Sequence, residues 1–350
     1  MMNPETRTTL ARLVKALPDA AFALSADNRL ICINAAARQL FSGMREGDPV
    51  SRNVRAPEIL DAIAEARAAG LSLVTWLSRV PLERQFDTRV AALDPEIAGA
   101  VLVTLRDMTE VRRIERMRTD FVANASHELR TPLATLIGFV ETLQGPARND
   151  ASARARFLGI MGEQARRMSR LIDDLLSLSR VEQNLHLRPS TTVDLTEIAR
   201  HMRDALTPIA GEMGATIAIE APTPVYVRGD RDELLRVAEN LVENAIKYGG
   251  PGLVKVSVSQ DGNAGTLCVE DRGPGIAPEH LPRLTERFYR IDDEASRSKG
   301  GTGLGLAIVK HIVARHQGRL LIWSEPMKGA RFSVVLPHAE CDQPIDPASL

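Results

Sequence analysis

The sequence predicts a multidomain α+β protein that contains a small α+β domain, a helical hairpin and an α/β sandwich. Three observations support this prediction. The 350 residues exceed what one compact core usually holds. An apolar repeat at helical spacing occupies the middle of the chain, and helix and strand patterns alternate on both sides of it. With 44% hydrophobic residues, the chain has enough apolar side chains for several cores.

The first region, residues 1–107, is predicted to be the small α+β domain. Short apolar runs at 20–24 and 29–34 flank a polar turn, which indicates two adjacent strands. The remaining elements expected here are helices at 35–41 and 57–69 and strands at 71–80 and 99–105.

The second region, residues 108–186, is predicted to be an antiparallel helical hairpin with a turn at 144–150. Its apolar seam repeats every three or four residues, at Val111, Ile114, Met117 and Phe121 and then at Leu158, Met161, Ala165, Met168, Ile172 and Leu175. Two stripes alone bury a thin core, so we expect a homodimer that completes a four-helix bundle. A monomeric hairpin packed on its neighbouring domain is the alternative.

The third region, residues 187–340, is predicted to be an α/β sandwich, and residues 341–350 a frayed tail. Helix patterns lie at 194–213 and 230–248. The strands expected beside them are 216–220, 254–260, 267–271 and 332–336.

Composition excludes several classes of function. The 44 basic and 45 acidic residues nearly cancel, which argues against a nucleic-acid partner. Cys32, Cys268 and Cys341 lie far apart, so reduced thiols are expected rather than a zinc site or disulfides. No apolar stretch approaches the roughly 18 residues of a membrane span, and no secretory signal is visible. We therefore expect a cytoplasmic location, with any membrane association supplied by a missing anchor or a membrane-protein partner.

The sharpest motif is Ser-His-Glu-Leu-Arg-Thr-Pro at 126–132, within the first long helix. A solvent-facing imidazole at His127 can attack phosphorus, and Glu128 can accept a hydrogen bond from one ring nitrogen. Thr131 lies one helical turn further on, where its hydroxyl can hold a water for a reverse, phosphatase reaction. Pro132 predicts a kink. His127 taken alone would be an ordinary surface histidine.

A second cluster lies on the helix expected at 230–248. Asn240, Asn244 and Lys247 recur at i, i+4 and i+7 and so share one face, with Tyr248 beside them. Amide oxygens suit Mg²⁺, although a solvated polar face is an equally good interpretation of this cluster alone.

Glycines mark two further sites. Asp271 ends an apolar strand, where it can accept a hydrogen bond from the adenine amino group, and Gly273 and Gly275 let the backbone approach the base. The glycine-rich loop 300–306 can direct backbone N–H groups at phosphates, and residues 296–299 are expected to form a mobile lid. Arg290 is a plausible phosphate partner. Tight turns and surface charge are the alternatives.

Taken in order, these motifs resemble those of the sensor histidine kinases of two-component systems. The resemblance implies a Bergerat-type ATP-binding domain that uses ATP and Mg²⁺, with Asn244 on the metal and Asp271 on adenine. It also implies transfer of a phosphoryl group from His127 to an aspartate of a response-regulator receiver domain. The nucleotide-binding residues it implies are Asn240, Asn244, Lys247, Tyr248, Asp271, Gly273, Gly275, Ile276, Arg290, Gly301, Thr302, Gly303, Leu304 and Gly305.

More narrowly, residues 284–290 and 301–311 look like those of phosphate-regulon sensors. This implies a PAS domain at the amino terminus and a PhoB-like regulator in phosphate-starvation signalling. Such sensors carry a membrane segment before that domain, and this sequence shows none. No histidine precedes His127, so axial histidine ligation of haem is excluded in the PAS-like region. An ATPase clamp like Hsp90, gyrase or MutL, and a non-catalytic scaffold, are the competing hypotheses.

Overall fold

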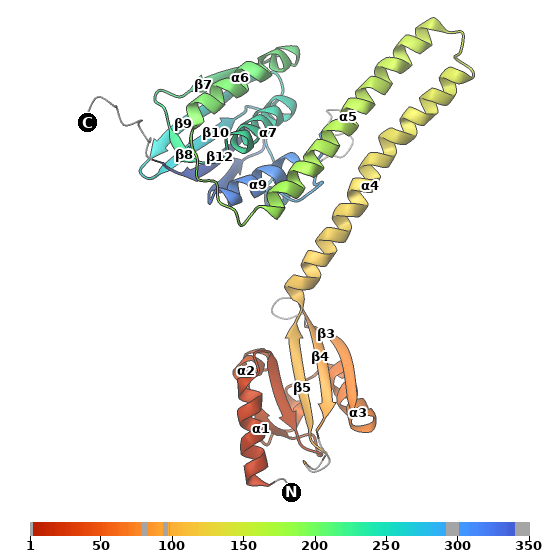
Figure 1. Cartoon of the computed structure of the whole chain (residues 1–350), viewed down its shortest axis with the longest axis vertical. Coiled ribbons are helices and arrows are strands. Elements are labelled where there is room, and N and C mark those ends of the chain that lie inside the picture. The colour runs from red at the N-terminus through yellow and green to blue at the C-terminus, as the bar shows by residue number, and fades with distance from the viewer. Residues whose placement is uncertain (1–2, 79–82, 94–96, 98, 292–300, 340–350) are drawn as a thin grey trace, which may run out of the picture. The chain divides into compact units, whose positions relative to one another are not determined.

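The computed structural model describes residues 3–78, 83–93, 97, 99–291 and 301–339 (Figure 1). The chain divides into two compact units, Met1–Ala123 and Asn124–Leu350. The helices within the described ranges are all too short or too polar to cross a membrane. The multidomain α+β fold class that the sequence predicts is confirmed.

A five-stranded antiparallel sheet with strand order β2-β1-β5-β4-β3 forms the centre of the first unit. The strands are β1 (Ala20–Leu24), β2 (Leu30–Ile33), β3 (Leu71–Ser78), β4 (Arg84–Ala92) and β5 (Val101–Asp107). The helices are α1 (Pro4–Ala16), α2 (Ala35–Leu40), α3 (Pro57–Ala69) and the 3₁₀ turn η1 (Val50–Arg52).

Both faces of this sheet carry a core. Phe22 belongs to the larger apolar cluster, which also takes in residues of α2 and α3. On the other face, Leu10 and Val14 of α1 pack against Ala21 and Ala23. The sequence did not predict α1 or β4. Helix α1 buries only two apolar side chains, and the buried positions of β4 include the polar Thr88 between Phe86 and Val90, which weakens its apolar pattern.

The long helices α4 (Thr109–Gln144) and α5 (Ala151–Gln183) confirm the predicted hairpin and its turn (Figure 1). Asp150 caps α5 by accepting hydrogen bonds from the backbone N–H groups of Ser152 and Ala153, at 3.0 and 2.9 Å. Helix α4 continues without interruption through Pro132, which is buried.

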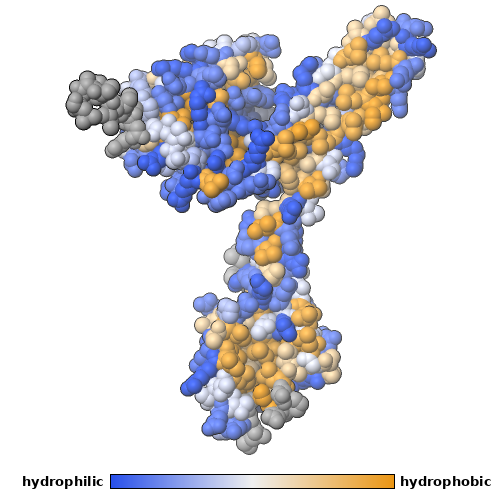
Figure 2. All heavy atoms as spheres, viewed as in Figure 1, coloured by the Kyte–Doolittle hydropathy of each residue, from blue (hydrophilic) through white to orange (hydrophobic). Residues whose placement is uncertain are grey.

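Apolar side chains remain exposed along the hairpin, where Figure 2 shows a hydrophobic stripe. Its large exposed members are Leu133, Ile137, Val140, Leu158, Ile172 and Leu176. An exposed stripe of this length is typical of helices that associate with other helices.

The carboxyl-terminal part is an α/β sandwich with strand order β11-β12-β10-β9-β7. Only the β7–β9 pair is parallel, whereas the three other pairs are antiparallel. The strands are β7 (Ala215–Glu220), β9 (Gly252–Asp261), β10 (Ala264–Glu270), β11 (Arg319–Ser324) and β12 (Ala330–Pro337). The helices that cover the sheet are α6 (Leu195–Glu212), α7 (Arg231–Gly249) and α9 (Gly305–Arg315) (Figure 1).

Smaller elements complete this domain. They are the two-stranded ribbon β6 (Thr192–Asp194) with β8 (Tyr226–Arg228), and the 3₁₀ turn η3 (Leu281–Arg283). The sequence did not predict β11, because large apolar residues stand on both of its faces, so its sequence does not alternate between apolar and polar residues.

Candidate functional site

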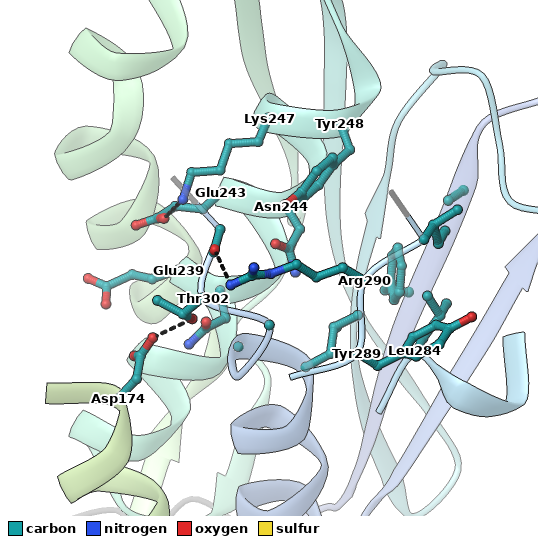
Figure 3. Close-up of a pocket in the computed structure, with 18 of the residues that line it drawn as sticks. Asp174, Glu239, Glu243, Asn244, Lys247, Tyr248, Leu284, Tyr289, Arg290 and Thr302 are labelled. Carbon is teal, nitrogen blue, oxygen red and sulfur yellow. Dashed lines mark hydrogen bonds and ion pairs between the residues drawn. The ribbon is translucent and has the colours of Figure 1, made fainter. Parts of the chain in front are cut away.

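A cavity of about 670 Å³ lies between α7, the loop after β10, the glycine loop before α9 and helix α5 (Figure 3). The structure brings the predicted nucleotide-binding residues together around it, with two exceptions, Gly273 and Leu304. Gly273 packs against Asp271 and Gly249, and the Leu304 side chain, within the glycine loop, is fully buried.

Helix α7 contributes one wall of the cavity. Its core side buries Leu241 and Val242, so the polar stripe of Asn240, Asn244 and Lys247 faces the cavity. The Asn240 side-chain amide donates to the carbonyl oxygen of Arg236 at 2.8 Å, which leaves its amide oxygen on the cavity side. Lys247 forms an ion pair with Glu243, and Tyr248 lines the cavity one residue further on (Figure 3).

Asp271 lies just after β10 and lines the cavity. Its Oδ1 accepts hydrogen bonds from the backbone N–H groups of Gly273 at 2.8 Å and Ala330 at 3.3 Å. Burial nevertheless raises the pKa of this carboxyl above its ordinary value of 3.8. Among the described residues both bonds go to Oδ1, so Oδ2 is available to a donor on a ligand.

Glycines let the loops close around Asp271 and α7. A Cβ atom on Gly275, where φ is +71°, would lie 2.0 Å from the carbonyl oxygen of Glu325. A Cβ atom on Gly273 would lie 2.6 Å from the Cα atom of Gly249. Gly273 therefore shapes the cavity wall without lining it.

The glycine loop before α9 is held against the same helix. Gly303 has a φ of +73°, and its carbonyl oxygen accepts a hydrogen bond from the N–H of Phe288 at 2.8 Å. A Cβ atom on Gly305 would lie 2.4 Å from Oδ1 of Asn240. The backbone can therefore approach α7 only because this position has no side chain. The predicted lid, 296–299, and Gly300 lie outside the described residues.

Arg290 connects the cavity to the helix of the predicted phosphoacceptor. Its guanidinium donates two hydrogen bonds, of 3.1 and 3.0 Å, to the carboxylate of Glu128 and another, of 2.9 Å, to the carbonyl oxygen of Gly301. Only 4% of the Arg290 side chain is exposed, and its Nε is buried without a hydrogen-bond partner in the described structure. An unsatisfied buried donor of this kind is expected where an anionic ligand binds.

The surroundings of His127 differ in part from the prediction. His127 is exposed on α4, as expected for a phosphoacceptor. The Glu128 carboxylate, however, pairs with Arg290 and with Arg167, at 3.3 Å, because residue i+1 lies about 100° around the helix from residue i. Thr131 donates its hydroxyl hydrogen bond to the carbonyl oxygen of His127 at 3.3 Å.

Helix α5 supplies cavity residues that no sequence motif marked. Asp174 accepts hydrogen bonds from Thr302 Oγ1 and from Arg236 Nη2, each at 2.8 Å. Glu239 of α7, which no motif marked either, also lines the cavity, and burial followed by the charge of Glu243 raises its pKa. The one available signal was the acidic pair at 173–174, which falls between the apolar positions Ile172 and Leu175 of the repeat.

The cavity fits an adenine nucleotide with Mg²⁺. Asp271 offers a carboxylate to the cavity, Asn244 an amide side chain and the glycine loop its backbone. No cluster of three or more histidine, cysteine or acidic residues that could hold a metal is present in the described ranges. A metal here would therefore need phosphates and water for most of its ligands, which is the usual coordination of Mg²⁺. Fold and site together define an ATP-dependent kinase with a helical phosphoacceptor domain.

Comparisons with known proteins agree with this class. Residues 117–184 match the family described as His Kinase A (phospho-acceptor) domain. Residues 229–340 match the family of histidine kinase-, DNA gyrase B-, and HSP90-like ATPases. The chain is 36% identical over 324 residues to the phosphate regulon sensor protein PhoR of Pseudomonas aeruginosa, covering 91% of this chain and 72% of that protein. The chain therefore belongs to the sensor histidine kinases and is an enzyme of that class.

Two other known proteins are also similar to this chain. The sensor-like histidine kinase SenX3 of Mycolicibacterium smegmatis is 38% identical over 252 residues, which cover 71% of this chain and 65% of SenX3. The solved structure of histidine kinase ThkA with response regulator TrrA aligns with a TM-score of 0.50 at 21% identity, covering 95% of this chain and 99% of that one. At that identity the match shows a shared fold.

Proposed function

We propose that this histidine kinase phosphorylates itself on His127 and then passes the phosphoryl group to an aspartate of a response regulator. One observation carries the proposal. Arg290 at the nucleotide cavity holds Glu128, the residue next to the exposed His127, through two hydrogen bonds. Through this pair, the helix segment that carries the imidazole is joined to the side of the cavity where the phosphates are proposed to bind.

In the proposed reaction, a ring nitrogen of His127 attacks the γ-phosphorus of ATP while the bond to the β,γ-bridging oxygen breaks and ADP leaves. Asp271 would hold the adenine amino group, and Asn244 would hold Mg²⁺, which would offset the negative charge of the phosphates. Lys247, Tyr248, Arg290 and the glycine loop would contact the phosphates and sugar. The aspartate of the regulator then attacks the phosphohistidine, and the imidazole is restored.

The roles of the other regions are part of the same proposal. We assign residues 1–107 to a PAS-like sensor domain, 108–186 to the dimerising phosphotransfer hairpin and 187–340 to the catalytic domain, with 341–350 as a tail. The strand order of the first sheet and the exposed apolar stripe of the hairpin support these assignments. The similarity to PhoR supports a PhoB-like regulator of phosphate-starvation signalling as the partner.

The test is incubation of the purified chain with ATP labelled in the γ-phosphate. The expected product is a phosphoprotein that is labile in acid and stable in alkali, as phosphohistidine is, and His127→Gln should abolish it. Stable labelling of that variant would refute His127 as the acceptor. ATP hydrolysis that continues undiminished without His127 would favour the clamp-type ATPase instead.

A further inference from the structure

Asp174 holds two parts of the nucleotide cavity from outside the catalytic domain. Asp174 belongs to α5 of the hairpin, whereas the nucleotide-binding motifs lie in the catalytic domain that follows. Its side chain is 19% exposed. Oδ2 accepts the hydroxyl hydrogen of Thr302, and Oδ1 accepts from Nη2 of Arg236 on α7, both at 2.8 Å. Figure 3 shows the Asp174 carboxylate directed at Thr302.

The bond to Thr302 occupies a donor that a phosphate needs. A hydroxyl has one hydrogen to donate, and that of Thr302 is given to Asp174. The same oxygen accepts from the backbone N–H of Leu304 at 3.3 Å, so the hydroxyl is fixed within the glycine loop. A phosphate oxygen can bind the Thr302 hydrogen only after the carboxylate has released it.

The other hairpin helix makes an equivalent contact. Glu128 of α4 binds the guanidinium of Arg290 with both carboxylate oxygens, at 3.1 and 3.0 Å. Thr302 and Arg290 both line the cavity, and each is bound to a carboxylate from the hairpin. The carboxylates of Asp174 and Glu128 therefore take positions that the oxygens of a polyphosphate require.

We propose that Asp174 is a positioning residue that acts as a phosphate surrogate, so that the hairpin and the phosphates of a nucleotide compete for the glycine loop. The inference rests on the proposed function, in which this cavity binds an adenine nucleotide. Negative charge on the nucleotide also repels the Asp174 carboxylate once the two are close. Phosphate binding then releases α5 from the loop, whereas a ligand without phosphates leaves the contact intact.

The test compares ADP and adenosine on the full chain, by calorimetric titration in the presence of Mg²⁺. Asp174→Asn keeps the shape and one acceptor but removes the charge. The variant weakens the state in which α5 is bound to the glycine loop, because that state loses the charge of the Asp174 carboxylate. ADP should therefore bind roughly three- to tenfold more tightly to this variant. The affinity for adenosine should stay unchanged. Asp174→Ala provides a second variant with the same expected direction.

The matched control is Glu163→Gln, which removes one negative charge from an exposed position on the same helix. Its ADP affinity should equal that of the unmodified chain. An unchanged or weaker ADP affinity in both Asp174 variants would overturn the inference. An equal gain for adenosine would overturn it too, because the competition would then not involve phosphates. Failure of the unmodified chain to bind either ligand would instead refute the proposed nucleotide site.

Discussion

The guanidinium of Arg290 and the carboxylate of Glu128 form a two-pronged ion pair at 3.0 and 3.1 Å, with only 4% of the Arg290 side chain exposed. A paired geometry of this kind is the strongest form of the arginine–carboxylate interaction. The pair links the helix that carries His127 to the nucleotide cavity. Any ligand that takes over Arg290 must therefore alter the surroundings of His127.

Glu128→Gln should destabilise the nucleotide-free protein by about 1–3 kcal/mol, because the buried guanidinium loses its charged partner. Mg²⁺ with ADP should recover much of this loss, since phosphates supply the missing negative charge. Chemical denaturation with and without ADP measures both effects, with Glu141→Gln on the same helix as the control. An equal loss of stability in both conditions would show that phosphates do not replace Glu128.

Asp271 gives nucleotide binding a pH dependence. Burial raises the pKa of this carboxyl above its ordinary value of 3.8, so it takes up a proton at a higher pH than an exposed aspartate does. The carboxylate that accepts from the adenine amino group is present above this raised pKa and is lost as the pH falls through it. Adenosine affinity, which no phosphate complicates, should therefore fall on acidification, beginning above the usual aspartate range.

Asp271→Asn tests the assignment. The variant should bind adenosine about tenfold or more weakly. The adenine amino group would then face the amide N–H₂ of asparagine, a second donor, in place of a carboxylate oxygen that accepts. The acid-dependent loss of affinity should also disappear, since asparagine does not titrate in this range. Calorimetric titrations at several pH values measure both changes. A variant that keeps the acid dependence would assign the effect to another group.

The sequence indicates candidate residues best where the signal is local. Asp271, Gly273 and Gly275 follow a strand within a few residues, and the polar stripe of α7 repeats at helical spacing, so short patterns reveal both. The contacts of the hairpin are different. Asp174 meets partners 62 and 128 residues away, and Glu128 meets Arg290 across 162 residues. Tertiary packing alone sets such pairs, and no periodicity encodes them.

Two substitutions separate backbone strain from steric exclusion. Gly262→Ala, in the β9–β10 turn at a φ of +55° with open space around it, should cost roughly 1 kcal/mol from strain alone. Gly275→Ala adds a contact of 2.0 Å with the carbonyl oxygen of Glu325, so the loop after β10 must move. We expect Gly275→Ala to abolish detectable ADP binding and Gly262→Ala to preserve it. Equal binding by the two variants would contradict this account of the loop.

His316 makes stability depend on pH. Its ring is fully buried, with Nε2 accepting from the N–H of Asp230 at 3.0 Å and Nδ1 bonded to the carbonyl oxygen of Ile312 at 2.8 Å. This arrangement requires the neutral ring, and burial lowers the pKa below its ordinary value of 6.5. In this range the unfolded chain binds the proton more readily than the folded one, so stability falls as the pH decreases through 6.5.

Denaturation at pH 7.5 and at lower pH values measures this slope. His316→Gln should lower the free energy of unfolding by about 1–3 kcal/mol at neutral pH, through the loss of buried hydrogen bonds. The variant should also have a shallower pH dependence. His186→Gln, at an exposed position, should leave the slope as it is. A slope unchanged in His316→Gln would exclude His316 as its source.

Thr131 and Thr135 offer a matched pair for testing the phosphatase reaction that the sequence predicts. Both lie on α4, and each donates its hydroxyl to the carbonyl oxygen four residues earlier, Thr131 to His127 at 3.3 Å and Thr135 to Thr131 at 3.1 Å. The two bonds make similar small contributions to the helix. Only Thr131 lies one turn from the phosphoacceptor, where its hydroxyl can turn to hold a water in line with the aspartyl phosphate of a bound regulator.

Thr131→Ala should therefore slow dephosphorylation of the regulator by about tenfold or more, in line with the loss of one positioned group in catalysis. Autophosphorylation on His127 should change by less than about threefold, because that step needs the imidazole and the nucleotide site and no water. Thr135→Ala should leave both rates near those of the unmodified chain. Parallel losses of both rates in Thr131→Ala would instead indicate damage to the helix, and the in-line water would have to be abandoned.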